Sequence, residues 1–317
     1  MTLFPEGTVV FAKSGMSCMT GNVYVLPEPC YVVSHLACVI PVGDYAVYLK
    51  HYFRSNRPSK LVENPSFPSI RLSKIQNMEL EIPVRSEMEK QVRSLEHIES
   101  LIEWSKEQIA MLDTLVKSRF VEMFGDGQWK RTALSEVADI QGGLTKSGKR
   151  DLLPLKLPYL RVANVLRGTL YLDEVLEIGL TAAECEKNLL VEGDLLFVEG
   201  NGSADQIGRC AVWDGSIAPC VHQNHLIRVR FDERVLPVYA LAYFNAHDGR
   251  EQIVARAVNT SGLFTLSTGK VKALQMPLPP LPLQQKFADF VNNVDKSRFN
   301  LLKAYGSIIA LFRVLFP

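Results

Sequence analysis

Three short stretches of the sequence carry residue types that could do chemistry. The first, GLTKSGKR (143–150), nearly matches the phosphate-binding pattern GxxxxGK followed by Ser or Thr. Arg150 stands where that pattern needs a hydroxyl group for magnesium, and DLLPLKLP follows instead of a helix whose N-terminus would receive a phosphate. The stretch therefore indicates a flexible basic loop able to touch a nucleic-acid backbone, rather than a nucleotide site.

The other two stretches are NPSF (64–67) and CVHQNHL (220–226). NPSF has serine in place of the second proline of the Asn-Pro-Pro-Phe type of loop in amino-group DNA methyltransferases, and no glycine-rich turn for S-adenosylmethionine follows a strand. Cys220, His222 and His225 have the chemistry of zinc ligands, but spacings of two and three scatter them over both faces of a strand. We expect no catalytic centre, metal or cofactor in this chain, and the sequence favours a binding protein.

Length and composition limit the classes of protein to which this chain can belong. A chain of 317 residues predicts two or more domains, and a net charge of +1 gives no global attraction to nucleic acid. A basic footprint must therefore be local. The region 129–170 has eight Lys or Arg side chains against three Asp or Glu, which fits either a nucleic-acid contact or a solvated basic surface.

Cysteine spacing and the residues at the chain ends indicate the cellular compartment of the protein. The six cysteines show no CxxC pair, which predicts reduced, mostly buried thiols in a cytosolic protein. The start, MTLFPEG, does not resemble a signal peptide. The apolar end, SIIALFRVLFP, is too short to span a bilayer and is interrupted by Arg313.

An internal repeat organises the chain. EGTVVFAKSGMSCMTGNVYVL from Glu6 and EGDLLFVEGNGSADQIGRCAVW from Glu192 follow the same pattern at an offset of 186. Later matches raise the offset, to 190 for SHL (34–36) with NHL (224–226) and to 194 for Pro83 with Pro277. Projected backwards, the second copy begins near Trp129, so we expect the first copy to lack roughly its first sixty residues.

Both copies have a mixed texture and end in a long helix. Short runs rich in Val, Ile and aromatic residues predict strands: VVFAKSG, YVVSHLACVIPV, DLLFVEG, RCAVW and HLIRVRF. Residues 45–53 and 239–247 predict helices. Residues 86–124 predict a helix of about 58 Å at 1.5 Å per residue, which is too long for the core of a compact domain.

Each long helix carries one apolar stripe. A stripe must be buried, so we expect the two helices to pair antiparallel and to hold the two globular parts at opposite ends of a rod. The alternative is that each helix packs on its own domain. The residues expected to pair the helices are Leu95, Ile98, Ile102, Ile109, Leu112, Phe290, Val294, Leu301 and Ile308.

The chain resembles the specificity subunits of type I restriction-modification systems over nearly its whole length. MPLPPLPLQQKFADFV (276–291) resembles the proline-rich step into a spacer helix, with Gln285 in the usual position, and LDTLVKSRFVEMFG (112–125) resembles the end of the central helix. LPYLRVANV (157–165) resembles the characteristic strand, and the segment from Glu192 resembles the GDLLF segment.

The resemblance implies an α+β fold in which two long helices, pairing as an antiparallel coiled coil, separate two mixed α/β target-recognition domains, the first incomplete. The domains would be a partial first recognition domain at 1–83, a central spacer helix at 84–125, a second recognition domain at 126–281 and a C-terminal spacer helix at 282–317.

The resemblance also implies a function: a non-catalytic, cytoplasmic subunit that reads a bipartite DNA target, or a half target if the first domain is defective. Modification (methyltransferase) subunits, which hold S-adenosylmethionine, would dock on the helices, and a restriction (endonuclease) subunit would join them. The alternative is a helical assembly module, or an inactive remnant, that does not read DNA. The candidate DNA-binding residues are Lys146, Lys149, Arg150, Arg161, Asn164, Asn201, Ser203, Gln206, Arg209, Asn224, Asn259 and Ser261, with Lys13, Ser14, Ser17 and Asn22 in the matching loop of the first domain.

Overall fold

The computed structural model describes residues 2–80, 82–125, 129–260 and 262–315. Contacts divide the chain into two compact units, Met1–Ala110 with Arg298–Pro317, and Met111–Ser297. This division crosses both long helices, and the sequence-based boundaries of four segments stay a prediction. We describe each unit by itself.

A four-stranded antiparallel sheet forms the centre of the second unit. Its order is β12 (Cys210–Val212), β10 (Leu195–Val198), β14 (Leu226–Phe231) and β7 (Ala138–Gly142). All four side chains of β10 are buried, because Leu195 and Phe197 face one apolar cluster while Leu196 and Val198 face another. Burial on both faces explains why this strand is a continuous apolar run rather than an alternating one.

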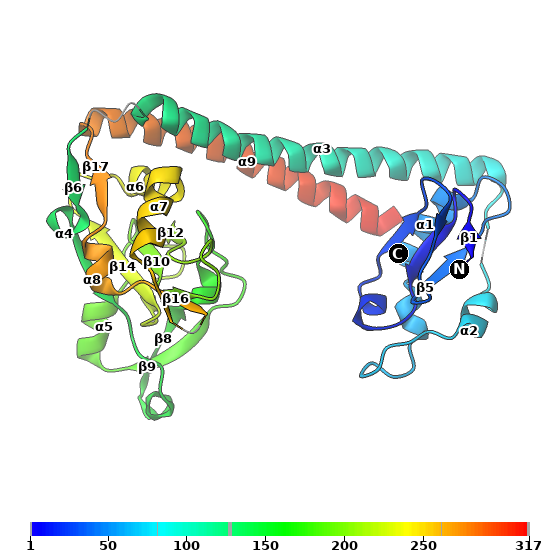
Figure 1. Ribbon diagram of the computed structural model, residues 1–317, viewed down its shortest axis with the longest axis horizontal. Helices are drawn as coiled ribbons and strands as arrows, with labels where there is room; N and C mark the ends of the chain where they lie inside the picture. Colours follow the sequence, from blue (N-terminus) through cyan, green and yellow to red (C-terminus); the bar gives the residue numbers. More distant parts are fainter. Residues whose placement is uncertain (1, 81, 126–128, 261, 316–317) are drawn as a thin grey trace. The chain divides into compact units, whose positions relative to one another are not determined.

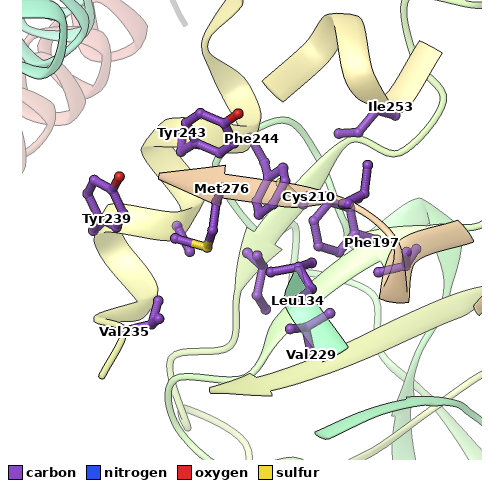
Figure 2. Packing of buried hydrophobic residues seen from close by; sticks show 14 of the residues in the cluster. Leu134, Phe197, Cys210, Val229, Val235, Tyr239, Tyr243, Phe244, Ile253 and Met276 are labelled. Carbon is purple, nitrogen blue, oxygen red and sulfur yellow. The ribbon is translucent and has the colours of Figure 1, made fainter. Parts of the chain in front are cut away.

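The larger of these clusters joins the sheet to helices distant in sequence. Figure 2 shows Phe197 and Val229 from the sheet packed with Tyr239 and Phe244, and Met276 beside them. The Tyr239 hydroxyl donates to the carbonyl oxygen of Pro277 at 2.9 Å, so its polar end is satisfied inside the core. Besides parts of the two long helices, this unit contains the shorter helices α4 (Leu134–Val137), α5 (Ala182–Asn188), α6 (Pro237–Asn245), α7 (His247–Arg256) and α8 (Thr268–Lys272).

Three smaller sheets complete the second unit. Strands β13 (Val221–His222), β8 (Leu155–Leu160) and β9 (Leu176–Leu180) form one, and β11 (Gly200–Asn201), β16 (Leu263–Thr265) and β15 (Val258–Thr260) form another. The third pairs β17 (Gln275–Pro277) with β6 (Arg131–Ala133). The first two carry the loops in which sequence analysis places the DNA-binding residues.

The first unit has a smaller sheet with the order β3 (Val23–Val25), β2 (Val9–Ala12) and β5 (Leu36–Val39). Helix α1 (Ala46–Ser55) packs on it through Phe53, whose ring centroid lies 5.1 Å from that of Phe11. This unit also contains the strand pair β1 (Leu3–Phe4) and β4 (Cys30–Tyr31), and helix α2 (Leu72–Gln76). The run YVVSHLACVIPV, predicted as one strand, is divided between β4 and β5 by a turn.

The internal repeat is confirmed as a structural repeat. The order β3-β2-β5 reproduces β12-β10-β14. Equivalent hydrogen bonds recur: the Lys13 N–H donates to the His35 oxygen at 2.9 Å, and the Glu199 N–H donates to the His225 oxygen at 3.0 Å. Similarly, the Ile70 N–H donates to Lys13, and the Leu266 N–H donates to Glu199, both at 2.7 Å.

The two long helices are α3 (Arg85–Phe124) and α9 (Leu281–Leu315), and they pack against each other antiparallel (Figure 1). In the second unit Phe120 and Phe124 of α3 contact Phe287 of α9, with ring centroids 5.5 and 5.7 Å apart. These aromatic residues also belong to the core of the second unit, so the helix ends pack on a domain as well as on each other. The helices therefore pair with each other, as the apolar stripes predict, and at this end they also pack on a domain, as the alternative predicts.

The residues expected to pair the helices are not equally buried. Leu95, Ile98 and Val294 are buried. The others are half-buried: Ile102, Ile109, Leu112, Phe290, Leu301 and Ile308. The polar position Ser105 is also buried, and its hydroxyl donates to the Leu101 oxygen at 2.7 Å. The individual pairs that the sequence suggests stay a prediction. Within the described ranges, no helix has the length and apolar character that crossing a bilayer would require.

Candidate nucleic-acid interface

In the basic loop 143–152, Lys146 and Lys149 are exposed to solvent, whereas Arg150 forms hydrogen bonds with neighbouring parts of the domain. The Arg150 guanidinium donates to both carboxylate oxygens of Glu184, at 2.8 and 3.1 Å, and to the Gly179 oxygen at 3.1 Å. This hydrogen bonding lowers the pKa of Glu184 to about 2. Position 179 must be glycine, because a Cβ there would lie 1.9 Å from the Arg150 oxygen. Arg150 thus fixes the loop to β9 and α5, and its contact with DNA stays a prediction.

Asn164 and Arg161 also hold the fold together. Asn164 is fully buried, accepts from the Arg161 N–H at 2.9 Å, and donates to the oxygens of Tyr171 and Glu174 at 2.9 Å each. The Arg161 guanidinium forms an ion pair with the Glu174 carboxylate at 3.3 Å. Asn164 therefore shapes the loop 161–174 from inside, where a base edge cannot reach it without rearrangement.

Arg209 ties the repeated loop 199–209 to that same loop. Its Nε donates to the Val165 oxygen at 2.7 Å, and a terminal nitrogen donates to the Val162 oxygen at 3.0 Å. The preceding Gly208 has φ of +60°, and a Cβ there would lie 2.4 Å from Ile253. Glycine at 208 is what allows Arg209 to turn toward Val162 and Val165.

Three arginines converge beneath the repeated loop. Arg167 forms an ion pair with Asp205 at 3.3 Å, and Arg250 of α7 donates to the Asp205 backbone oxygen at 2.9 Å. Burial and the positive charge of Arg167 lower the pKa values of Arg209 and Arg250. Arginine nonetheless stays charged at neutral pH, so Arg167, Arg209 and Arg250 place three cations near one another, and Arg167 alone of the three pairs with the Asp205 carboxylate. We call these three residues the arginine cluster.

Sequence reasoning missed two members of the arginine cluster as site residues. Arg167 lies in the basic region 129–170, so the composition of that region could have identified it. It lies outside the segment of the repeat from which site residues were chosen. Arg250 lies on α7, more than forty positions from the loop it supports, and nothing in its local sequence distinguishes it. A guanidinium cluster of this kind suits a phosphate oxygen, which accepts charge-assisted hydrogen bonds.

The small sheet beside the cluster aligns two asparagines. Asn201 of β11 and Asn259 of β15 are both in register with Phe264 of the central strand β16. Directly paired residues point to the same face of a sheet, so the two amides flank the Phe264 ring. Each Oδ1 accepts a turn N–H, from Ser203 at 2.9 Å and from Gly262 at 3.2 Å. The turn geometry thereby fixes both amide groups near a candidate ligand surface.

The remaining predicted residues lie around these loops. Ser203 is exposed, and the Gln206 amide donates to the Asp205 carboxylate at 2.7 Å. Asn224 belongs with the basic loop instead, because its N–H donates to the Leu144 oxygen at 3.0 Å. Within the described residues, no hydrogen bond or ion pair joins the loop 143–152 to the loop 199–209, and Ser261 lies outside those residues. The structure thus supplies two candidate contact regions in the second unit.

The matching loop of the first unit is less charged. Lys13 and Ser14 are half-buried, and the Ser14 hydroxyl is 2.8 Å from Nδ1 of His35. Ser17 and Asn22 are exposed. Lys13 is the sole cationic residue of the sequence 13–22. The arginine cluster has no equivalent in this loop.

The other stretches with suggestive chemistry have structural roles. NPSF is an exposed turn in which the Asn64 side chain accepts from the Ser66 N–H at 3.0 Å. Cys220 and His222 are buried, whereas His225 is exposed and lies 3.1 Å from the Glu199 carboxylate. Over the part of the chain that the structure describes, His, Cys, Asp and Glu side chains form no group of three able to hold a metal ion.

Comparison with known proteins assigns the family. The type I restriction modification DNA specificity domain matches residues 2–113 and 127–306. The chain is 23% identical over 322 residues to the EcoKI specificity subunit of Escherichia coli strain K12, covering 92% of this chain and 68% of that protein. It is 24% identical over 337 residues to the StySPI specificity subunit of Salmonella potsdam, covering 96% and 72%.

Solved structures show the same fold. The S subunit of the type I restriction-modification system from M. genitalium superposes with a TM-score of 0.53 at 16% identity, covering 100% of this chain and 84% of that one. A chain from a structural study of assembly and conformational transition of the type I system gives 0.59 at 16% identity, covering 99% and 82%. The chain belongs to the family of type I restriction-modification specificity subunits.

Proposed function

We propose that this chain is the non-catalytic DNA-reading subunit of a type I restriction-modification complex, working in the cytoplasm. The observation that carries the proposal is the arginine cluster held beneath the loop 199–209, next to the aligned amides of Asn201 and Asn259. Cations that contact phosphates supply affinity, and amide side chains that reach base edges supply sequence choice. These two kinds of group occur together in the second unit.

The target follows from the structural repeat. Two homologous recognition domains would read the two halves of a split target, and the paired helices would set the spacer between the halves. The first unit lacks the arginine cluster in its matching loop, which supports weaker DNA contact there. In that case the chain reads the half target of its second domain.

The partners follow from family membership. Modification subunits would bind S-adenosylmethionine and methylate adenine, and would dock on α3 and α9, after which restriction subunits join. Exposed apolar side chains outside the buried stripe support such docking: Trp104 and Phe299 in the first unit, and Met111 and Leu115 in the second. No cofactor is assigned to this chain itself.

Salt-dependent DNA binding tests the proposal. The chain, in complex with its modification subunit, is titrated into duplexes selected from a random library, with binding followed by fluorescence anisotropy. Affinity should fall steeply as salt rises, and Arg167→Glu should reduce the slope of log affinity against log salt by about 1. Lys272→Glu, an exposed site on α8, makes the same charge change outside the cluster and should keep the slope. Binding without salt dependence or sequence selection would contradict the proposal.

Two pairs of substitutions distinguish the DNA-reading function from the alternative of a helical assembly module. Ile102→Asp with Ile109→Asp should abolish docking of the modification subunit under either function, because both side chains lie in the half-buried stripe of α3, and charges there would disrupt the helix pair that carries the docking surface. Lys146→Glu with Lys149→Glu should weaken DNA binding only if the chain reads DNA. Arg150 is left unchanged in this test, since its ion pair with Glu184 supports the fold.

A further inference from the structure

The small sheet β11-β16-β15 places two identical side-chain amides around one aromatic ring. Asn201 of β11 and Asn259 of β15 are both in register with Phe264 of the central strand, so the three side chains share one face. Asn201 is half-buried and Asn259 is exposed. Phe264 is half-buried, because it packs against the core of the second unit. The domain therefore holds this face in place and leaves part of it accessible. We call it the amide–ring face.

Hydrogen bonds in the turns fix which end of each amide is free. Oδ1 of Asn201 accepts from the Ser203 N–H at 2.9 Å, and Oδ1 of Asn259 accepts from the Gly262 N–H at 3.2 Å. A backbone N–H donates to the oxygen of an amide and not to its nitrogen, so Nδ2 lies on the other side of each group. Among the described residues, neither Nδ2 donates to a protein acceptor. The amide–ring face thus presents N–H donors on both sides of an apolar ring.

The major-groove edges of the bases differ in how they match this pattern. Thymine presents the acceptor O4 next to its 5-methyl group. Cytosine presents an amino donor and no methyl group, adenine presents an amino donor beside N7, and guanine presents two acceptors and no methyl group. Of the four bases, thymine alone offers both an acceptor for Nδ2 and an apolar group for the ring.

The arginine cluster lies close enough for one duplex to touch both surfaces. Arg167 and Arg250 contact Asp205. Asp205 follows Asn201 by four positions in the loop 199–209, so the chain between them spans at most about 14 Å. The major groove is about 12 Å wide. A duplex with a phosphate at the cluster can therefore bring a base edge to the amide–ring face.

We infer that the amide–ring face reads one thymine in the major groove of the DNA target. An Nδ2 donor of Asn201 or Asn259 bonds to O4 of the base, and the Phe264 ring contacts the 5-methyl group. The arginine cluster contacts a neighbouring phosphate. The inference rests on the proposed DNA reading and adds to it the identity of one base.

A base analogue tests the contact with the methyl group. The chain, in complex with its modification subunit, first selects duplexes from a random library. Each thymine of the selected sequence is then replaced in turn by deoxyuridine, which lacks only the methyl group. At one position this replacement should weaken binding about fourfold by fluorescence anisotropy, since one apolar carbon loses its contact.

Substitutions on the two faces of β16 assign that contact to the ring. Phe264→Ala should bind the thymine and deoxyuridine duplexes equally. Leu263→Ala is the matched control, because Leu263 is 48% exposed and successive residues of a strand point to opposite faces. It should keep the fourfold preference for thymine.

A second analogue tests the amides. At the same position, 5-methylcytosine paired with guanine keeps the methyl group and replaces O4 by an amino donor, so binding should weaken about tenfold. Asn201→Asp and Asn259→Asp, made singly, keep the oxygen that accepts the turn N–H and convert the free donor into an acceptor. The variant of the amide that bonds O4 should shift the ratio of the two affinities about tenfold toward 5-methylcytosine. Both variants keep Phe264, so this test holds even if Phe264→Ala fails to fold.

The outcomes separate this inference from the proposed function. A selected sequence with no thymine sensitive to deoxyuridine, or with the same sensitivity in Phe264→Ala, would overturn the inference and leave DNA reading intact. A change of preference at a guanine, rather than at a thymine, in both Asn→Asp variants would also overturn it. Failure to select any sequence would contradict DNA reading itself, and the inference would fall with it.

Discussion

Phe120 of α3 and Phe287 of α9 meet edge to face, with ring centroids 5.5 Å apart and ring planes at 73°. Phe124 and Tyr239 complete a four-ring cluster, with centroids 4.9 Å apart. The cluster joins the end of one long helix, the start of the other and α6 of the second domain. Helix pairing and domain packing are therefore one cooperative structure at this point.

Removing one ring of the cluster should destabilise the second domain. Phe287→Ala leaves a cavity between three aromatic rings and should lower the free energy of unfolding by about 3–5 kcal/mol. Guanidinium denaturation followed by the fluorescence of buried Trp213 measures the change. Phe299→Ala, on the same helix but 67% exposed, is the matched control and should change it by less than about 0.5 kcal/mol. Equal effects of the two substitutions would contradict the role of the cluster.

Glu99 anchors α3 on the first domain. Its carboxylate contacts Nζ of Lys50 at 2.8 Å and the Arg54 guanidinium at 2.5 Å, both on α1. Glu99→Gln should reduce the opening free energy of α1 by about 1–3 kcal/mol, because two cations lose a charged partner. Hydrogen exchange of residues 46–55 measures this. Glu103→Gln, which removes an exposed pair with Lys106, should leave exchange in α1 unchanged.

Acid should destabilise the second domain through His222. Burial lowers the pKa of His222 from 6.5 to about 4, and the charge of Arg228 acts in the same direction. Between these values the unfolded chain binds a proton that the folded protein excludes, so stability falls as pH drops from 6.5 toward 4. His222→Leu should flatten this part of the curve of unfolding free energy against pH. The exposed His247→Gln should leave the slope intact, and an unchanged slope in His222→Leu would refute the prediction.

Substitutions at the neighbouring residues Lys149 and Arg150 should have different effects on stability and on DNA binding. Arg150→Ala should lower the unfolding free energy by roughly 1–3 kcal/mol, because it removes the two hydrogen bonds to Glu184. Lys149→Ala, at an exposed position, should leave stability unchanged and weaken DNA binding, with a smaller salt slope. Thermal unfolding and anisotropy are measured on the same preparations. A stability loss confined to Lys149→Ala would reverse this assignment.

Repetition and periodicity made much of the fold predictable. The helix predicted over 86–124 is α3, and those predicted near Tyr45 and Tyr239 are α1 and α6. The apolar runs of the repeat correspond to β2, β10, β12 and β14. These patterns are reliable because burial of one face, or of both, imposes a fixed spacing of apolar residues along the chain.

Side-chain roles in the loops were not predictable in the same way. Asn164, Arg150 and Arg209 have the residue types of DNA contacts, yet each makes several hydrogen bonds inside the domain. Most of their partners lie seven or more positions away and follow no period. Only the folded chain brings them together.

The sequence by itself determined the family, the repeated strand pattern and the two amphipathic helices, since these depend on local spacing and on order along the chain. The tertiary structure decided which cations converge, because Arg167 and Arg250 meet at Asp205 through packing of α7 against distant loops. Within the described residues it also paired β5 with β2 alone, since strand pairing is a contact between distant segments. Long-range contacts of this kind are set by the whole fold and leave no local spacing to read.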